Sequence, residues 1–108
     1  MRTLRAIIID PFLREIREGE IDDDLAEYQR ICGGHYIEFG VWINGKDVLY
    51  VSDFAHWRES FAIGKRHVFS GTGLITGGDA RGKNMSKSAR VSLSEIRDVV
   101  RFGLAQAR

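Results

Sequence analysis

Apolar residues along the chain fall into short runs whose spacing differs from one segment to the next. Residues 4–9 form a continuous run, rich in isoleucine and followed by Asp10-Pro11, which is typical of a buried strand. Residues 12–21 are highly charged, contain Gly19 and follow the proline, so we expect a turn and a second, exposed strand there. Their charges would also suit a helix, but glycine and proline both disfavour one.

Residues 35–52 have the clearest strand pattern in the chain. Asn44-Gly45 in the middle is typical of a tight hairpin turn, because both central residues of such a turn need positive φ. A two-residue connection predicts the cross-strand pairs Ile43 with Lys46, Val41 with Val48, and Phe39 with Tyr50. Strict alternation assigns one face to Ile37, Phe39, Val41 and Ile43, and the other to Tyr36, Glu38, Trp42, Leu49, Val51 and Asp53. Both faces hold large apolar side chains, so we expect the hairpin to be central in the sheet or covered on both sides.

The first helix signal covers residues 22–32. Asp24 and Glu27 predict a capping box, and acidic residues in the first turn suit the positive end of the helix dipole. Gly33-Gly34 follows and ends the helix, because glycine adopts the left-handed conformation at low cost. We expect the buried face of this helix to consist of Leu25, Tyr28 and Cys32.

The second helix signal begins at Ser92, whose spacing from Glu95 predicts another capping box. One or two strand residues at Arg90-Val91 lead into this helix. Its apolar stripe, at i, i+3 and i+4 spacing, comprises Leu93, Ile96, Val99, Val100 and Leu104.

The segments between the hairpin and the closing helix carry weaker patterns. Residues 53–64 have aromatic residues at helical spacing after Asp53, so they form either a short capped helix or an ordered loop. Residues 66–76 fit a strand in which Gly71 and Gly73 predict a bulge or a close backbone approach. Residues 77–90 hold glycines, cations and few apolar side chains, which indicates a surface loop.

Together these patterns predict a single α+β domain over residues 1–108, with a mostly antiparallel sheet of about five strands and two packed helices. No internal repeat or linker divides the chain. The exposed edge at residues 12–21 gives a route to a homodimer, in which two such strands pair across a two-fold axis.

Composition and charge place the chain among soluble globular proteins. Hydrophobic residues make up 44% and charged residues 29%, with neither a signal-like start nor a run long enough for a membrane span. The single cysteine, Cys32, excludes an internal disulfide and suits a reducing compartment, so we expect a cytoplasmic protein without membrane contact. The net charge of +1 is unevenly divided, since the first 54 residues hold eleven Asp/Glu and six Lys/Arg, and the last 54 hold four and ten. This division indicates either two electrostatically different faces or charges that cancel when the halves interleave.

The run GGDARGKN at residues 77–84 has the glycine-lysine spacing of a phosphate-binding loop. Asn84 stands where such a loop needs Ser/Thr for magnesium, and no helical pattern follows it. Metal binding is also disfavoured, because Cys32 and His35 are the only locally close pair of ligand residues. Cys32 ends a helix and shares its buried face, so it fits a core position better than a nucleophile. We therefore expect a protein that is not an enzyme and that holds no metal or cofactor.

Aromatic and basic side chains provide the best candidates for a binding site. For an anionic ligand such as a nucleotide-like signal, arginine offers bidentate phosphate contacts and an aromatic face holds a base. The candidate ligand-binding residues are Trp57, Arg58, Lys65, Arg66 and Tyr36, with Arg81 and Lys83 as a closing loop and Glu38 for a ligand amine. The alternative is a nucleic-acid-binding protein that uses the basic loop 81–90, with Trp42, Trp57 and Tyr36 as stacking surfaces. A solvated loop accounts for the same basic residues.

The chain carries a further series of short motifs in a fixed order. They are Ile21-Asp22, then Leu25, Gln29 and Ile31, Gly33-Gly34 and Tyr36-Ile37-Glu38, followed by GTGLITG at residues 71–77 and Ser92-Leu93 with Ile96. This series resembles a family of small domains found in bacteriophages, mobile elements and their bacterial hosts, although His35 is an additional residue before the tyrosine. That family has no settled activity, so the resemblance implies a setting rather than a reaction. We expect an accessory protein of the host cytoplasm that binds and neutralises a host component, either a defence protein or a nucleotide-like signal.

Overall fold

The computed structural model describes residues 3–54, 56–78 and 87–104. This part of the chain contains eight strands and two helices, and neither helix is long and apolar enough to cross a membrane. The strands of the larger sheet are β1 (Thr3–Asp10), β2 (Glu15–Asp22), β3 (Ile37–Ile43), β4 (Asp47–Ser52) and β7 (Gly73–Gly77). The strands of the smaller sheet are β5 (Glu59–Ile63), β6 (His67–Ser70) and β8 (Val100–Leu104). The helices are α1 (Leu25–Ile31) and α2 (Leu93–Val99).

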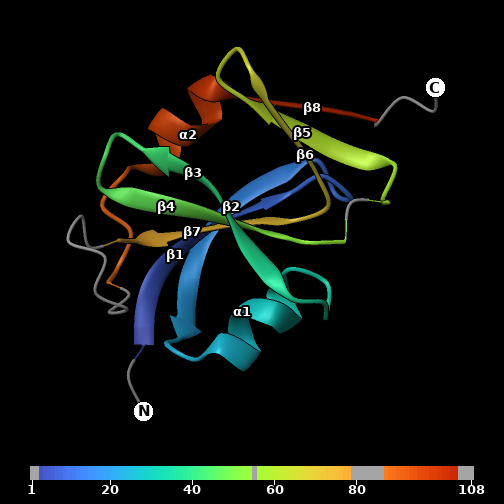
Figure 1. Cartoon of the computed structure of the whole chain (residues 1–108). Coiled ribbons are helices and arrows are strands. Elements are labelled where there is room, and N and C mark those ends of the chain that lie inside the picture. Colours follow the sequence, from blue (N-terminus) through green and yellow to red (C-terminus); the bar gives the residue numbers. More distant parts are fainter. Residues whose placement is uncertain (1–2, 55, 79–86, 105–108) are drawn as a thin grey trace.

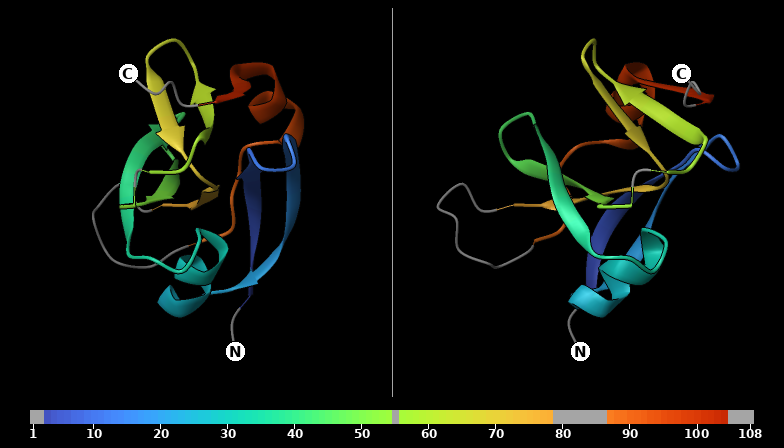
Figure 2. Two further views of the ribbon diagram at one scale, coloured as in Figure 1. Left: turned by 90° about the vertical axis from the view of Figure 1, so that its right-hand side faces the viewer. Right: turned by 45° about the vertical axis from the view of Figure 1, so that its right-hand side comes forward.

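Both sheets are antiparallel throughout, with strand orders β2-β1-β7-β4-β3 and β6-β5-β8. Figure 1 shows α1 and α2 at opposite ends of the molecule, with α2 beside the smaller sheet. The further views in Figure 2 show the smaller sheet across one end of the larger one. The predicted α+β class and five-stranded antiparallel sheet are present, whereas the second sheet was not predicted and each helix has only seven residues.

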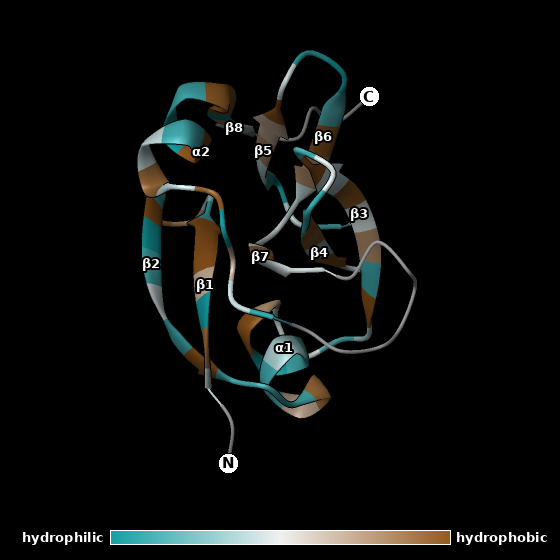
Figure 3. Cartoon of the chain, turned by 90° about the vertical axis from the view of Figure 1, so that its left-hand side faces the viewer, coloured by the Kyte–Doolittle hydropathy of each residue, from teal (hydrophilic) through white to brown (hydrophobic). Residues whose placement is uncertain are grey.

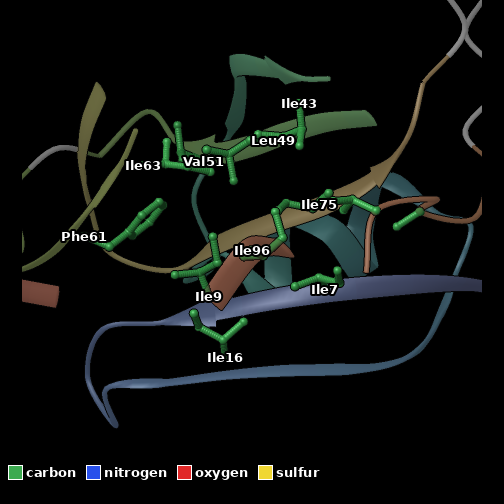
Figure 4. Close-up of a cluster of buried hydrophobic side chains, with 12 residues drawn as sticks. Ile7, Ile9, Ile16, Ile43, Leu49, Val51, Phe61, Ile63, Ile75 and Ile96 are labelled. Carbon is green, nitrogen blue, oxygen red and sulfur yellow. The ribbon is translucent and has the colours of Figure 1, made fainter. Parts of the chain in front are cut away.

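The main hydrophobic core lies between the two sheets and α2 (Figure 4). Its buried side chains include Ile7, Ile9, Ile16, Ile43, Leu49, Val51, Phe61, Ile63, Ile75 and Ile96. Ala89 and Val91, from the segment before α2, belong to the same core. Burial of each large apolar side chain contributes about 2 kcal/mol, so this core is the main stabilising contact between the sheets.

The opposite face of the larger sheet carries a second core beneath α1. Tyr28 and Cys32 are buried there against Leu74 of β7 and against β1, as the helical spacing predicted. Leu25 was predicted to share this face but is exposed. Leu25 is the first residue of a seven-residue helix. Tyr28 and Cys32, which follow it on the same face, are the residues that cover the sheet.

Both helices begin at the predicted capping residues. Asp24 caps α1 by accepting a backbone N–H of the first turn, but Glu27 forms an ion pair with Arg30 instead of completing a capping box. Ser92 and Glu95 do form the predicted box at the start of α2.

The β3–β4 hairpin forms as predicted, but its register differs near the turn. Three residues connect the strands, so Ile43 lies opposite Asp47, one position later than predicted. A bulge at Gly40 then shifts the register back by one residue. As a result, Phe39 lies opposite Tyr50, which is the predicted pair.

The bulge also decides which side chains of β3 share a face. Phe39 and Trp42 point to one face of the sheet, because their partners lie two positions apart on the regular strand β4. Glu38 and Val41 point to the other face for the same reason. Strict alternation paired Glu38 with Trp42 and Phe39 with Val41, and this prediction was wrong because it allowed for no extra residue.

The smaller sheet begins where the sequence patterns were weakest. The described residues 53, 54 and 56–58 are irregular rather than helical, and residues 59–63 form β5, so the predicted short helix is not present there. The strand predicted at residues 66–76 is in fact β6 and β7, which belong to different sheets, and Gly71 lies between them with a φ of 78°. Gly73 passes so close to Phe61 that a Cβ there would lie 2.6 Å from its ring, which confirms the predicted close backbone approach.

After α2 the chain continues as strand β8 rather than as helix. Val100 and Phe102 pair with residues of β5, and the helix ends at Val99, which is exposed. The predicted apolar stripe is therefore helical only as far as Val99, and its last two residues, Val100 and Leu104, lie in β8. Valine and phenylalanine favour strands, and Gly103 disfavours a helix, so the pairing with β5 prevails.

Residues 87–91 fill a gap in the larger sheet. β1 and β7 pair only over residues 7–9 of β1. Further along, Lys87 exchanges two backbone hydrogen bonds with Gly77, at 2.7 and 3.0 Å, and the Ala89 N–H donates to the Arg5 carbonyl at 2.8 Å. The segment therefore lies between the two strands where they separate.

Two side chains hold this segment in place. The buried Asp47 accepts the N–H groups of Arg90 and Val91 on its Oδ2, at 2.9 and 2.7 Å. Arg5 donates through Nη1 to the carbonyls of Ala89 and Val91, at 2.8 and 2.9 Å. Arg90 and Val91, predicted as strand residues, are thus held by a carboxylate instead of a neighbouring strand.

β2 is an edge strand, as predicted, and Figure 3 shows it mostly hydrophilic beside the hydrophobic β1. Its exposed charged side chains are Glu15, Arg17, Glu18 and Glu20. Charged side chains on an edge strand oppose pairing with another strand. The homodimer through this edge stays a prediction.

Replacement of the buried carboxylate tests its contribution to stability. We expect Asp47→Ala to lower the free energy of unfolding by about 3 kcal/mol, because two backbone N–H groups lose a charged acceptor. Asp53→Ala removes an exposed carboxylate just after the same strand and should change this free energy by less than about 0.5 kcal/mol. Urea denaturation followed by circular dichroism measures both, and equal effects would contradict a structural role for Asp47.

Candidate functional site

Several chain segments meet around Trp57 at one end of the molecule. The indole lies against two glycines with positive φ, Gly33 at 105° and Gly71 at 78°. A Cβ would lie 2.8 Å from the ring at Gly33 and 2.5 Å from it at Gly71. Only glycine therefore leaves room for the ring at either position.

The aromatic rings around Trp57 form one continuous cluster. The ring centroid of Trp57 lies 4.6 Å from that of Phe54, 5.8 Å from that of His35 and 6.4 Å from that of Phe12. His35 stacks on Phe54 at 4.5 Å, and His56 meets Phe54 edge-on at 5.0 Å. The cluster thus joins the β1–β2 turn, the α1–β3 connection and the β4–β5 connection.

Much of this cluster is open to solvent. Phe12 is 46% exposed, and the neighbouring side chains of Leu13 and Tyr36 are 67% and 75% exposed. We name the whole set the aromatic surface, comprising Phe12, Leu13, His35, Tyr36, Phe54, His56 and Trp57. Large apolar groups gathered in this way on a surface are typical of an interaction site.

The turn that presents Phe12 and Leu13 has a well-defined backbone. Asp10 accepts the N–H groups of both residues on Oδ1, at 3.0 and 3.1 Å. Its Oδ2 binds the guanidinium of Arg17 at 3.1 Å, and Arg14 closes the turn with a φ of 54°. The backbone that presents the two apolar side chains is therefore held by hydrogen bonds within the turn.

An open depression of about 370 Å³ lies beside the cluster. It is lined by Gln29 of α1 and by Gly34, His35 and Tyr36. These residues offer an amide, an imidazole and a phenol, and none of the described lining residues is a lysine or arginine. The depression can therefore take an uncharged or aromatic group more readily than a phosphate.

The structure brings together only part of the predicted ligand site. Trp57, Arg58 and Tyr36 lie at the end of the molecule that carries the aromatic surface. Lys65 and Arg66 lie in the β5–β6 turn, separated from Arg58 by the five residues of β5, or roughly 16 Å of strand. These three cations and two rings therefore do not converge on one ligand.

The other predicted site residues are also dispersed. Glu38 is exposed on the edge strand β3, on the face opposite Trp42. Arg81 and Lys83 lie outside the described residues, so the closing loop stays a prediction.

Sequence reasoning missed five members of the aromatic surface, namely Phe12, Leu13, His35, Phe54 and His56. The paired glycines before His35 and the glycine at position 71 were visible signals of unusual backbone. Such glycines indicate that something approaches closely, but the sequence does not identify Trp57 as that group. A turn and a second strand were predicted for residues 12–21, but nothing in the sequence indicated that the turn brings Phe12 against Trp57.

Three exposed side chains that can transfer protons lie in different segments of the chain. His56 is next to Trp57, whereas His67 begins β6 at the far end of β5, and Glu38 lies on β3. No three His, Cys, Asp or Glu side chains in the described ranges are grouped to hold a metal ion. Burial raises the pKa of the Cys32 thiol to about 12, so this group is not ionised at neutral pH.

Adjacent glycines offer a matched test of the packing around Trp57. Gly33→Ala should lower the free energy of unfolding by about 3 kcal/mol, because the new Cβ displaces the indole and occupies a positive φ. Gly34→Ala should cost about 1 kcal/mol, because Gly34 has a φ of 87° but no atom within 4 Å of a Cβ. Chemical denaturation and tryptophan fluorescence compare the two variants, and identical results would show that Trp57 does not restrict position 33.

Cysteine labelling tests the burial of Cys32. We expect no reaction with a thiol reagent at pH 8 in the folded protein and full reaction in denaturant, because the thiolate is the reactive form and the pKa is raised. Val68→Cys places a second thiol at an exposed position and should react at once in the folded state. Rapid labelling of both thiols in that variant would contradict the burial of Cys32.

No protein-family model, curated protein or solved structure matches the chain. What the site does is therefore inferred from its own residues and their arrangement.

Proposed function

We propose that the chain is a small non-enzymatic accessory protein, of phage or mobile-element origin, that binds and neutralises a host protein in the host cytoplasm. The observation that supports this most directly is the aromatic surface, in which exposed rings pack on one another around Trp57. Such a patch is costly to leave in water unless a partner covers it. The motif series supports the phage or mobile-element setting.

The aromatic surface has the properties of a protein-binding hot spot. Anchoring side chains that are already held in place lose little conformational entropy on binding. Phe12 comes near this condition, because Asp10 fixes the backbone of its turn and its ring meets Trp57 edge-on. The depression beside Tyr36 offers a recess for one side chain of the partner. A protruding turn next to a recess suits a folded protein better than a small molecule.

A nucleotide-like signal is a weaker candidate for the bound component. A phosphate group is best held by several cations at one place. Lys65 and Arg66 lie at the opposite end of β5 from Trp57 and Arg58. Within the described part of the chain, Arg58 is thus the one predicted cation that remains beside the ring cluster.

Paired surface variants test the role of the aromatic surface. We expect a tagged chain to retain one host protein from a bacterial lysate, and Phe12→Ala/Leu13→Ala to weaken that binding about thirtyfold or more, because a hot spot contributes about 2 kcal/mol or more. The control is Leu25→Ala/Val68→Ala, since these side chains are 61% and 68% exposed on other elements. The control should change the affinity by no more than about twofold. A partner that binds the first variant as well as the unchanged chain would refute the assignment.

Titration calorimetry with cyclic and linear nucleotides separates the two versions of the proposal. We expect no heat of binding from any of them. Heat that disappears in Trp57→Ala and Arg58→Ala would instead favour sequestration of a nucleotide-like signal over the covering of a protein.

A further inference from the structure

A second exposed aromatic pair lies on the edge strand β3, apart from the aromatic surface. Phe39 and Trp42 are 51% and 43% exposed, and their ring centroids lie 5.6 Å apart at an interplanar angle of 61°. In a regular strand, side chains three positions apart point to opposite faces. The bulge at Gly40 brings these two to the same face, and bulges commonly redirect side chains in this way beside functional sites.

Two cationic residues form hydrogen bonds with Gly78, which lies against Trp42. A Cβ at Gly78 would lie 2.8 Å from the ring of Trp42, so the backbone lies directly against the indole. The Gly78 N–H donates to the Lys46 carbonyl at 2.9 Å, and the Gly78 carbonyl accepts from the Arg90 guanidinium at 3.4 Å. Lys46 and Arg90 are both exposed, so two cationic residues are attached to the backbone that lies against Trp42.

The described carboxylates nearby are turned away or already engaged. Glu38 points to the other face of β3. Asp47 is buried and holds backbone N–H groups. Glu95 binds Asn44 at the tip of the hairpin, at 3.4 Å.

We propose that Phe39, Trp42, Lys46 and Arg90 form a binding site for single-stranded nucleic acid, independent of the aromatic surface. Exposed rings stack with bases of any sequence while cations contact the phosphates, and both are present within one small area. Lysine is depleted at protein–protein interfaces, so the exposed Lys46 favours nucleic acid over a protein partner. A duplex fits less well, because its bases are already stacked on one another and do not reach the rings.

Fluorescence anisotropy with labelled oligo(dT), oligo(U) and a duplex of equal length tests this site. We expect the unchanged chain to bind one or both single strands at low salt. Phe39→Ala and Trp42→Ala should each weaken binding roughly tenfold or more, as the loss of one stacking ring does, whereas Trp42→Phe should keep most of the affinity. Lys46→Ala should reduce the slope of log affinity against log salt by about 0.7.

The control removes the same kind of charge from another place. Lys65→Ala/Arg66→Ala deletes two exposed cations in the β5–β6 turn and should change the affinity by no more than about twofold. Circular dichroism checks that each variant is folded. If Trp42→Ala does not fold, the role of the two rings is judged from the affinities of Phe39→Ala and Trp42→Phe. The proposal is overturned if neither single strand binds, if the duplex binds as well as they do, or if the ring variants bind normally. It is also overturned if the control variant loses as much affinity as Lys46→Ala. Failure of this site would leave the aromatic surface untouched, because none of these variants alters it.

Discussion

The gap between β1 and β7 is the constraint on which the rest of the structure depends. Where the two strands separate, their backbone groups need partners, because buried N–H and C=O groups are costly to leave unpaired. Residues 87–91 supply those partners, and the carboxylate of Asp47 fixes the segment by accepting two N–H groups. Ala89 and Val91 also enter the main core, and α2 follows directly. The same attachment therefore positions α2, β8 and, through the β8–β5 pairing, the smaller sheet.

Both tryptophans of the chain lie against glycine backbone. Trp57 contacts the positions of Gly33 and Gly71, and Trp42 contacts that of Gly78. Without a Cβ, the main chain comes within van der Waals distance of the indole, so the ring is located by backbone geometry. Each proposed surface is therefore largely formed before any partner arrives. The two differ in their neighbours, since one ring lies among other aromatic groups and the other lies beside cations.

Elements whose signals are local could be predicted from the sequence. The isoleucine run of β1, the Asn44-Gly45 turn and the Ser92 cap each act over a few residues, and each led to the right element. β8 could not be predicted in this way, because the spacing of its apolar residues fits a helix as well as a strand and only pairing with β5 decides. The candidate site could likewise be predicted only where the signal was local. Trp57 was predicted as a binding residue, but its ring neighbours come from separate segments that no spacing in the sequence relates.

The insertion of residues 87–91 beside β1 has a consequence for how the chain folds as it is made. Arg5 forms hydrogen bonds with residues 84 and 86 positions further along the chain. During translation, β1 and β2 therefore leave the ribosome long before the segment that completes their sheet. Contacts between such distant parts of a sequence slow folding, and strands that wait without partners are prone to aggregate. β1 is thus completed only after residues 87–91 have emerged.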